Sequence, residues 1–422
     1  MNIQSSRKLS FIVLGSLICT SGSILNLLDI DEYLIFGLFI LLLFFAIKEE
    51  IFSNINNITA LFWLFFGVVV LLFFQAIIEK NSGNIFNKNN ISFILMSTSC
   101  GLACMIFTAR ANFVSDLNLI LKFVTMHGVL TLLVLAIFPS QTILLNLPDG
   151  SACYQGHFYI FLQRVNLNYL GDLVPIFVEI GDFRFRRIHG IAWEPGNYAA
   201  YVNLLLFINL FLRKNAKWTV ISAMAIILSW STAGLISLIF QLLMAFYVNR
   251  RTIVRRLGFI KICIVIGCAV SICFLFYINY EQKLFGNRSG SGASRVVNTM
   301  VAIKTLYDYP LGTGLYFRDY ALKINENLEG SQLAVYSIVD AEKVKSASST
   351  NSYLRMFVQL GIPTGMFLTF CIFRQQLVRK FRGIFGLVLI LVVSSAPILF
   401  YPFFMLFVVS GVLGFINRLH KF

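Results

Sequence analysis

Three arginines fall within four consecutive residues of the chain. Arg184, Arg186 and Arg187 belong to the segment Phe-Arg-Phe-Arg-Arg over 183–187. The guanidinium group presents a fixed fork of N–H donors that matches phosphate oxygens, so this cluster predicts binding of an anionic group. Attraction to anionic lipid headgroups would explain the cluster equally well. An extended conformation over 183–187 would place Arg187 on the opposite face from the other two arginines.

Two candidate general bases follow the arginine cluster. His189 has an imidazole that titrates near neutrality. Glu194 directly precedes Pro195, a residue that is favoured in the first turn of a helix. A carboxylate there can stabilise the helix end, or it can act as a general base or as a partner for an arginine. The free N–H groups of the same helix end would face a bound anion.

A second arginine-bearing segment lies at 287–295, which reads Asn-Arg-Ser-Gly-Ser-Gly-Ala-Ser-Arg. Glycine and serine make the backbone flexible or let it approach a ligand closely, but the Gly-Lys ending of a P-loop is absent from this stretch. Apolar residues then recur at helical spacing from Ser294 until Pro310. Arg295 would open this helix, where a positive charge opposes the helix dipole, so we expect it to have another task.

The composition identifies the elements that must position these residues. The chain has 422 residues, of which 58% are hydrophobic and 13% charged, and its mean hydropathy is +0.79. A water-soluble protein has about half apolar and a quarter charged residues. The chain is therefore expected to be an all-α polytopic membrane protein, and disorder is excluded by its 43 Phe.

Apolar runs predict about twelve transmembrane helices. The run over 218–248 is too long for one helix and is divided at Ser229–Gly234, and 383–417 is divided at Pro397 and Pro402. The expected spans are 10–28, 33–47, 57–78, 91–107, 118–138, 197–212, 218–231, 233–248, 259–279, 352–373, 383–396 and 400–417.

Short basic loops fix the expected orientation. Clusters of Lys and Arg at 213–217, 250–261 and 374–382 are separated by two spans each, so all three face one side. Basic short loops stay in the cytoplasm, which places both termini there as well. The net charge of +15 is thus explained largely by topology, and nucleic-acid binding is unsupported.

The same orientation places the two longest loops, 139–196 and 280–350, on the outer face. Loops of this length are usually functional or disordered, and these two carry the arginines described above. The apolar stretch 157–169 is expected to lie in the interface or dip into the membrane. The expected organisation is N-terminal helices over 1–138, a first external loop over 139–196, central helices over 197–279, a second external loop over 280–350, and C-terminal helices over 351–422.

Three sequence motifs follow one another through these loops. Residues 187–197 read Arg-Ile-His-Gly-Ile-Ala-Trp-Glu-Pro-Gly-Asn and run into a span. Residues 294–314 begin with Ser-Arg and end with Tyr-Pro-Leu-Gly-Thr-Gly. Residues 351–362 read Asn-Ser-Tyr-Leu-Arg-Met-Phe-Val-Gln-Leu-Gly-Ile and open the next span. In this order the motifs resemble the O-antigen ligase and polymerase superfamily of bacterial envelopes, over about 187–362.

The resemblance implies a GT-C-like helical glycosyltransferase in the bacterial inner membrane. Such enzymes join undecaprenyl-pyrophosphate-linked oligosaccharide repeats on the periplasmic face. Similar ligases carry a His directly before the Asn of the third motif, and this chain has Thr350 there. The resemblance therefore favours a Wzy-type O-antigen polymerase over a ligase. A chain-length regulator protein in the membrane is a further expected partner.

The reaction that the resemblance implies assigns roles to these residues. Arg187 and Arg295 are expected to stabilise the departing pyrophosphate, with Glu194 or His189 as the base. No Asp-rich metal motif occurs in the external loops, so arginine is expected instead of Mg²⁺, and no cofactor is expected. Further expected substrate contacts are Arg184, Arg186, Arg288, Gly190, Asn197, Gly312, Gly314, Tyr316 and Asn351.

A flippase or transporter for lipid-linked glycans is the main alternative. It would place ionisable residues within the spans, where this chain has few, namely Lys122, His127 and Arg355. The concentration of arginines in the external loops favours chemistry at the outer face.

Overall fold

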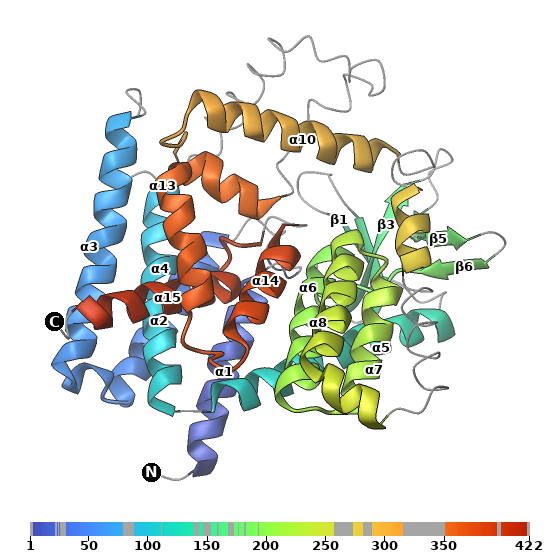
Figure 1. Cartoon of the computed structure of the whole chain (residues 1–422), viewed down its shortest axis with the longest axis horizontal. Coiled ribbons are helices and arrows are strands. Elements are labelled where there is room, and N and C mark those ends of the chain that lie inside the picture. The colour runs from blue at the N-terminus through green and yellow to red at the C-terminus, as the bar shows by residue number, and fades with distance from the viewer. Residues whose placement is uncertain are drawn as a thin grey trace.

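The computed structural model of the chain is shown in Figure 1. The residues it describes are 3–21, 23, 25, 31–78, 88–110, 112–138, 143–146, 153–157, 160–167, 173–175, 177–180, 183–192, 194–256, 273–281, 289–314, 351–394 and 398–419.

Helices dominate the described residues. They are α1 (Ile3–Cys19), α2 (Asp31–Lys48), the short η2 (Ile51–Ser53), α3 (Ile55–Ile78), α4 (Lys88–Arg110), α5 (Phe113–Ile137), α6 (Pro195–Phe207) with its π-helical continuation η3 (Ile208–Leu212), α7 (Ala216–Ser229), α8 (Thr232–Arg256), a helical segment at 273–281, α10 (Ser289–Asp308), α13 (Ser352–Arg374), α14 (Arg382–Val393) and α15 (Pro402–Leu419). Within this part of the chain, six helices are long and apolar enough to cross a membrane, and five are shorter and apolar. The prediction of an all-α polytopic membrane protein is confirmed.

The helix boundaries agree with the expected division between α7 and α8 and differ at the first helix. Trp230 adopts a left-handed conformation between α7 and α8, where the long run was expected to divide. The first helix ends at Cys19 and not at residue 28, because Thr20 Oγ1 and Ser23 Oγ bond the carbonyls of the last turn. The predicted span 259–279 lies mostly outside the described residues.

Helix α6 lies at the centre of the molecule, whereas α3 lies at its edge. In their apolar windows, 83% of α6 is buried inside the protein but only 17% of α3. Helix α6 is anchored by aromatic contacts, with ring centroids 5.1 Å apart between Phe207 and Phe385 and again between Phe385 and Phe407. Helix α3 is apolar on every side, as expected of a helix that faces lipid.

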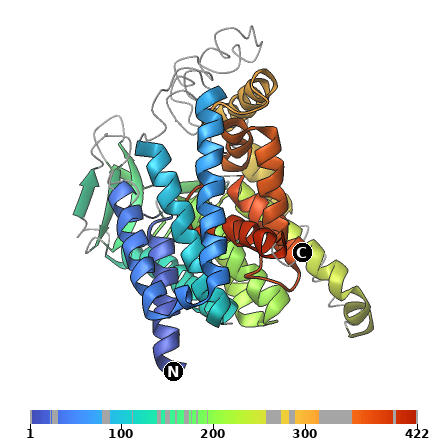
Figure 2. The same ribbon diagram turned by 90° about the vertical axis from the view of Figure 1, so that its left-hand side faces the viewer.

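Two groups of helices stand side by side (Figure 1). Helices α5–α8 form one group, and α2, α3, α4 and α13 form the other, with α15 running across α3, α4 and α13. Figure 2 shows α3 standing in front of this second group. Helix α10 lies across the upper ends of both groups and packs against α13.

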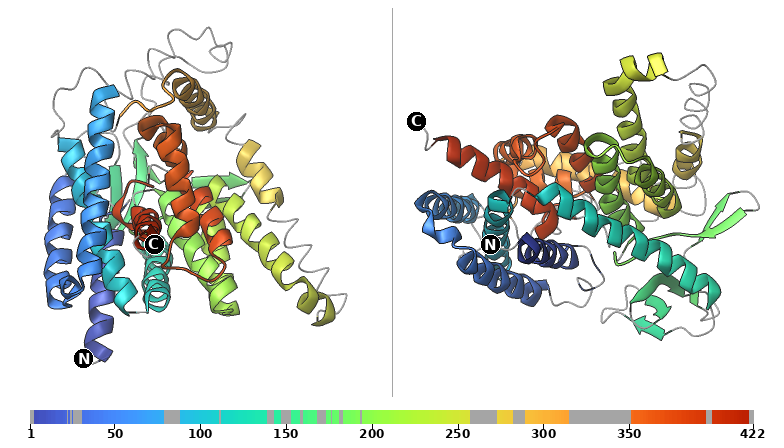
Figure 3. Two further views of the ribbon diagram at one scale, coloured as in Figure 1. Left: turned by 60° about the vertical axis from the view of Figure 1, so that its left-hand side comes forward. Right: turned by 90° about the horizontal axis from the view of Figure 1, so that it is seen from below.

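Two small antiparallel sheets occupy the first predicted external loop. One has the strands β1 (Ile143–Asn146), β2 (Cys153–His157), β3 (Phe161–Leu167) and β4 (Leu173–Pro175) in that order, and the other is a hairpin of β5 (Phe177–Ile180) and β6 (Phe183–Arg186). Seen from below, both lie at the end of the α5 group that is away from α3 (Figure 3). Residues 183–186 are extended in β6, and Arg187 lies outside the strand.

Most of the apolar stretch 157–169 lies in the sheet. Strand β3 is paired on both edges, from His157↔Phe161 to Leu167↔Leu173, so its backbone groups are satisfied by neighbouring strands. The expected position of this stretch in the interface stays a prediction.

Helix α10 also begins earlier than expected, at Ser289 instead of Ser294. The two glycines in its first turn cost about 1 kcal/mol each relative to alanine, which weakens a helix without forbidding it. Arg295 therefore lies in the second turn, and the argument that it opposes the dipole at the helix start is wrong.

Candidate functional site

Arg187 connects the first motif to the turn between α7 and α8. Its Nε donates to the carbonyl of Ser229 at 3.0 Å, and its Nη2 donates to the carbonyl of Trp230 at 3.3 Å. The next residue, Ile188, donates its amide to the carbonyl of Leu228 at 3.2 Å. The C-terminal carbonyls of a helix carry partial negative charge, so the guanidinium is well placed to stabilise this end of α7.

The other two arginines of the cluster have different surroundings. Arg186 Nη1 donates to the carbonyl of Leu135 at 3.1 Å, in the last turn of α5. Arg184 is exposed. The predicted anion-binding cluster is therefore divided, with two arginines at the ends of two helices and one exposed.

The residues after Arg187 form a tight turn against α5 and α6. Gly190 has a φ of 55°, and a Cβ there would come within 3.0 Å of the Gly128 backbone. His189 is buried, and its Nδ1 lies 2.8 Å from the carbonyl oxygen of Ala192. The imidazole therefore donates from Nδ1 and holds the turn.

Glu194 and Asn197 occupy the start of α6. Glu194 is the extended residue before Pro195, and its carboxylate makes no capping hydrogen bond to the helix. Asn197 is fully buried, and among the described residues neither Oδ1 nor Nδ2 has a hydrogen-bond partner. An unpartnered buried polar group costs about 1–3 kcal/mol, so such a residue marks a candidate site.

The start of α8 lies beside the start of α6. Gly196 is adjacent to Ser231, whose Oγ would be 3.9 Å from a Cβ at that position. Ser231 Oγ in turn accepts the amide of Gly234 at 3.4 Å. Two positive helix ends and the Arg187 guanidinium therefore gather at one place, which is an arrangement suited to an anion.

The second and third motifs meet at a break in α13. Pro363 lacks an N–H, so the carbonyl of Gln359 loses its helical partner. That carbonyl accepts instead from the Gly314 amide, while the Thr313 amide donates to Val358 at 2.9 Å. The Ile362 amide donates to the carbonyl of Pro310 at 2.8 Å. The backbone groups that the break releases are thus satisfied by the chain at 309–314.

Glycine is required on both sides of this junction. A Cβ at Gly312 would lie 2.6 Å from the Gln359 oxygen, and one at Gly361 would lie 2.5 Å from the Leu311 backbone. Both residues also have positive φ, 101° and 84°. These glycines therefore permit two backbones to pack directly together.

Comparison with known families adds one match. Residues 218–369 match the sequence model of a family described as O-antigen ligase. This match supports membership of the O-antigen ligase and polymerase superfamily. No curated protein and no solved structure matches the chain. The match includes the second and third motifs and leaves out the Arg187–Asn197 segment. Family members are glycosyl-transferring enzymes of lipopolysaccharide assembly that act on lipid-linked polysaccharide.

The family-like motifs form two clusters in space. Arg187, His189, Gly190, Glu194 and Asn197 lie at the ends of α5–α8, as described above. Gly312, Gly314 and Asn351 lie at α13, where Asn351 Oδ1 accepts the Leu354 amide at 2.9 Å and caps the helix. Arg295 belongs to α10, which spans the distance between the two groups (Figure 1). Arg288 and Tyr316 lie outside the described residues.

Sequence reasoning gave no role to a polar cluster at the α13 break. Gln75 Nε2 of α3 donates to the carbonyl of Gln359 at 3.0 Å, and Arg355 Nε donates to the Gln359 side chain at 3.1 Å. The available signal was the position of Arg355 and Gln359 one helical turn apart within an apolar span.

Proposed function

We propose that this chain polymerises undecaprenyl-pyrophosphate-linked repeat units of O-antigen, or of a related surface polysaccharide, at the periplasmic face of the inner membrane. The family match supports glycosyl transfer in surface-glycan assembly. The observation that carries the choice of polymerase is Thr350, which directly precedes the helix cap Asn351. Similar ligases have a histidine at this position, and this chain has a threonine.

The proposed reaction is transfer of the growing glycan to an incoming lipid-linked repeat. An acceptor hydroxyl attacks the anomeric carbon of the donor, the bond from that carbon to the pyrophosphate oxygen breaks, and undecaprenyl pyrophosphate leaves with the electron pair. The hydroxyl proton passes to a protein base. No net oxidation takes place, and the leaving group is already a good one, so charge stabilisation is the main task of the protein.

The first cluster supplies groups that suit this task. Arg187 is fixed by the carbonyls of Ser229 and Trp230, beside the starts of α6 and α8. Positive charge held rigidly where negative charge develops lowers the barrier more than mobile charge does. Arg295 on α10 is the second proposed phosphate ligand, with Arg184, Arg186 and Arg288 as secondary contacts.

Glu194 is the proposed base. It is half-buried at the start of α6 and is not used as a side-chain cap of that helix. His189 is more deeply buried, with Nδ1 committed to the carbonyl of Ala192. These surroundings favour the carboxylate for proton transfer and the imidazole for holding the turn.

A clean deletion of the gene tests the proposal, with lipopolysaccharide separated on a gel. A core that carries a single repeat is the expected result. Bare core would indicate a flippase or a ligase instead. An unchanged ladder would show that the protein has no part in the assembly of this glycan. Complementation with the wild-type gene must restore the ladder.

A further inference from the structure

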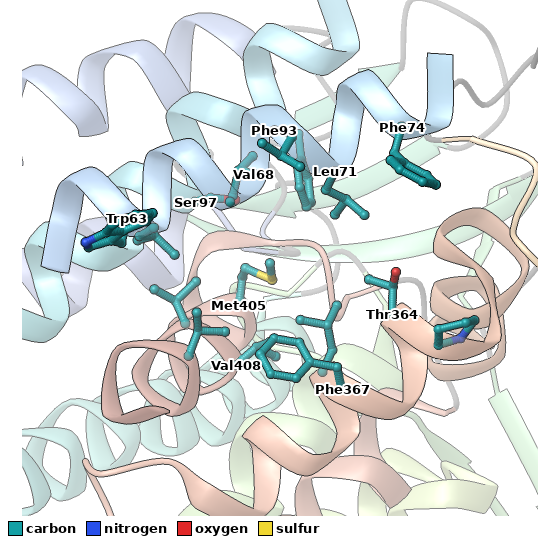
Figure 4. Close-up of a pocket in the computed structure, with 17 residues that line it drawn as sticks. Trp63, Val68, Leu71, Phe74, Phe93, Ser97, Thr364, Phe367, Met405 and Val408 are labelled. Carbon is teal, nitrogen blue, oxygen red and sulfur yellow. The ribbon is translucent and has the colours of Figure 1, made fainter. Parts of the chain in front are cut away.

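An apolar groove runs along the lipid-facing helix α3. It has a volume of about 500 Å³ and lies between α3, α4, α13 and α15 (Figure 4). Its lining on α3 extends from Trp63 to Phe74, about 16 Å along the axis at 1.5 Å per residue. Phe367 and Val408 face these residues from α13 and α15. The groove therefore has the length and character of a site for a hydrocarbon chain.

The groove is accessible from the bilayer. Trp63 is 44% exposed and Phe74 is 62% exposed, and α3 has the smallest buried share of the six long apolar helices among the described residues. In a membrane these faces meet lipid, so an occupant can enter sideways without crossing water.

One end of the groove adjoins a polar cluster. Phe74 is followed by Gln75, which is buried, and its Oε1 has no hydrogen-bond partner among the described residues. On α13 the groove residues Pro363 and Thr364 follow Gln359, which binds both Gln75 and Arg355. An apolar groove beside a polar cluster that includes a cation fits an amphipathic anion with a long tail.

The polar end is also joined to the proposed catalytic region. The carbonyl of Gln359 accepts the Gly314 amide, and the chain before Gly314 leads directly into α10, the helix that carries Arg295. A ligand whose head lies at Arg355 would thus have its tail in the groove and its charged group at the junction of the second and third motifs.

We propose that the groove holds the polyisoprenyl chain of the incoming lipid-linked repeat, with the pyrophosphate of that repeat directed toward Arg355. This assignment rests on the proposed function for the identity of the lipid. The aromatic lining, with Trp63, Phe74, Phe93 and Phe367, suits the flat, branched isoprene units. A single groove accommodates a single-chain lipid, whereas a phospholipid has two chains.

Gly67 gives a direct way to block the groove. It lines the cavity, and a Cβ built there meets no atom within 4 Å. Gly67→Leu therefore adds a side chain at a position where the Cβ meets open space and the residue lines the groove. Gly37 on α2 is equally open and lies outside the lining, so Gly37→Leu is a matched control. Both changes replace glycine in an apolar helix and should raise helix propensity equally.

The experiment uses purified full-length protein and a polyprenyl diphosphate that carries a photoreactive diazirine on its chain. Crosslinked peptides are identified by mass spectrometry. Labelling of α3 between Trp63 and Phe74 is expected, and Gly67→Leu should weaken it about tenfold, the scale on which a few carbon atoms discriminate in an apolar pocket. Gly37→Leu should label as the wild type does.

Competing lipids and an uncharged probe test separately which lipid the groove binds and whether its charged head contributes to binding. Unlabelled polyprenyl diphosphate should displace the probe, and an equal concentration of phosphatidylglycerol should not. Arg355→Gln should weaken labelling by the diphosphate probe but not by an uncharged polyprenol probe. Equal displacement by phosphatidylglycerol, or labelling unaffected by Gly67→Leu, would overturn the proposal. The groove could be labelled in the purified protein although deletion of the gene leaves the lipopolysaccharide ladder intact. That result would refute the polymerase assignment but not the lipid site.

Discussion

The backbone carbonyl of Gln359 accepts the amide proton of Gly314 at 3.0 Å. This bond joins the end of the second family-like motif to the middle of the third, at the point where Pro363 interrupts α13. It explains why the two glycine-containing motifs occur together in one chain. Each supplies the hydrogen-bonding groups that the other lacks, and small residues allow the two backbones to approach.

Gly312→Ala is expected to disrupt this junction. The new Cβ would lie 2.6 Å from the Gln359 oxygen, at a residue with a φ of 101°. The strained conformation alone costs about 1–3 kcal/mol, so the purified protein should melt at a lower temperature and the glycan ladder should be lost. Gly383→Ala is the control, because a Cβ there meets nothing within 4 Å. Equal melting temperatures for the two variants would contradict the requirement for glycine at residue 312 in this junction.

The sequence predicted the helices well but not the contacts between its motifs. Hydrophobic runs located α2 to α8 because lipid requires long apolar segments with internally bonded backbones. The left-handed Trp230 appeared where polar residues divided a long run. The pairing of 309–314 with α13 was not predictable, since it depends on backbone groups far apart in the chain. The carbonyl partners of Arg186 and Arg187 were missed for the same reason.

Arg187→Ala and Arg295→Ala are each expected to abolish long glycan ladders while the protein still inserts into the membrane. Loss of one electrostatic contact of this kind costs about 2–4 kcal/mol of barrier, or about 10²–10³ in rate. The measurement is a lipopolysaccharide gel from the deletion strain that expresses each variant. Arg213→Ala provides the control. Arg213 follows η3, at the opposite end of the α6–η3 helix from Glu194, and its guanidinium donates to Ser115 of α5. Normal ladders from both variants would show that the phosphate ligands lie elsewhere.

Arg187→Lys tests the geometry of the site separately from its charge. A lysine keeps the positive charge but cannot donate at once to Ser229 and Trp230 in the fixed directions of the guanidinium. The variant should therefore insert normally and still give markedly shortened ladders. A wild-type ladder would mean that charge alone suffices at this position.

Glu194→Gln is expected to slow glycan transfer without weakening donor binding. The amide has nearly the same shape as the carboxylate but cannot accept the acceptor proton. Transfer is measured by ladder length, and donor binding is measured with purified protein and a polyprenyl diphosphate probe. If the variant makes a wild-type ladder, the base is another residue, and His189→Gln becomes the next variant to examine.

Asn197→Ala and Asn203→Ala form a matched pair on α6, because both residues are fully buried. Asn203 donates to Ala199 and accepts from Gln241 at 2.9 Å, so its loss should cost about 1–3 kcal/mol of stability. Asn197 has no such partner among the described residues, and its replacement should lower the melting temperature less. If the Asn197 amide serves the substrate, Asn197→Ala should nevertheless shorten the ladder more than Asn203→Ala does. Equal ladders, with Asn197→Ala the less stable protein, would make this residue a packing group only.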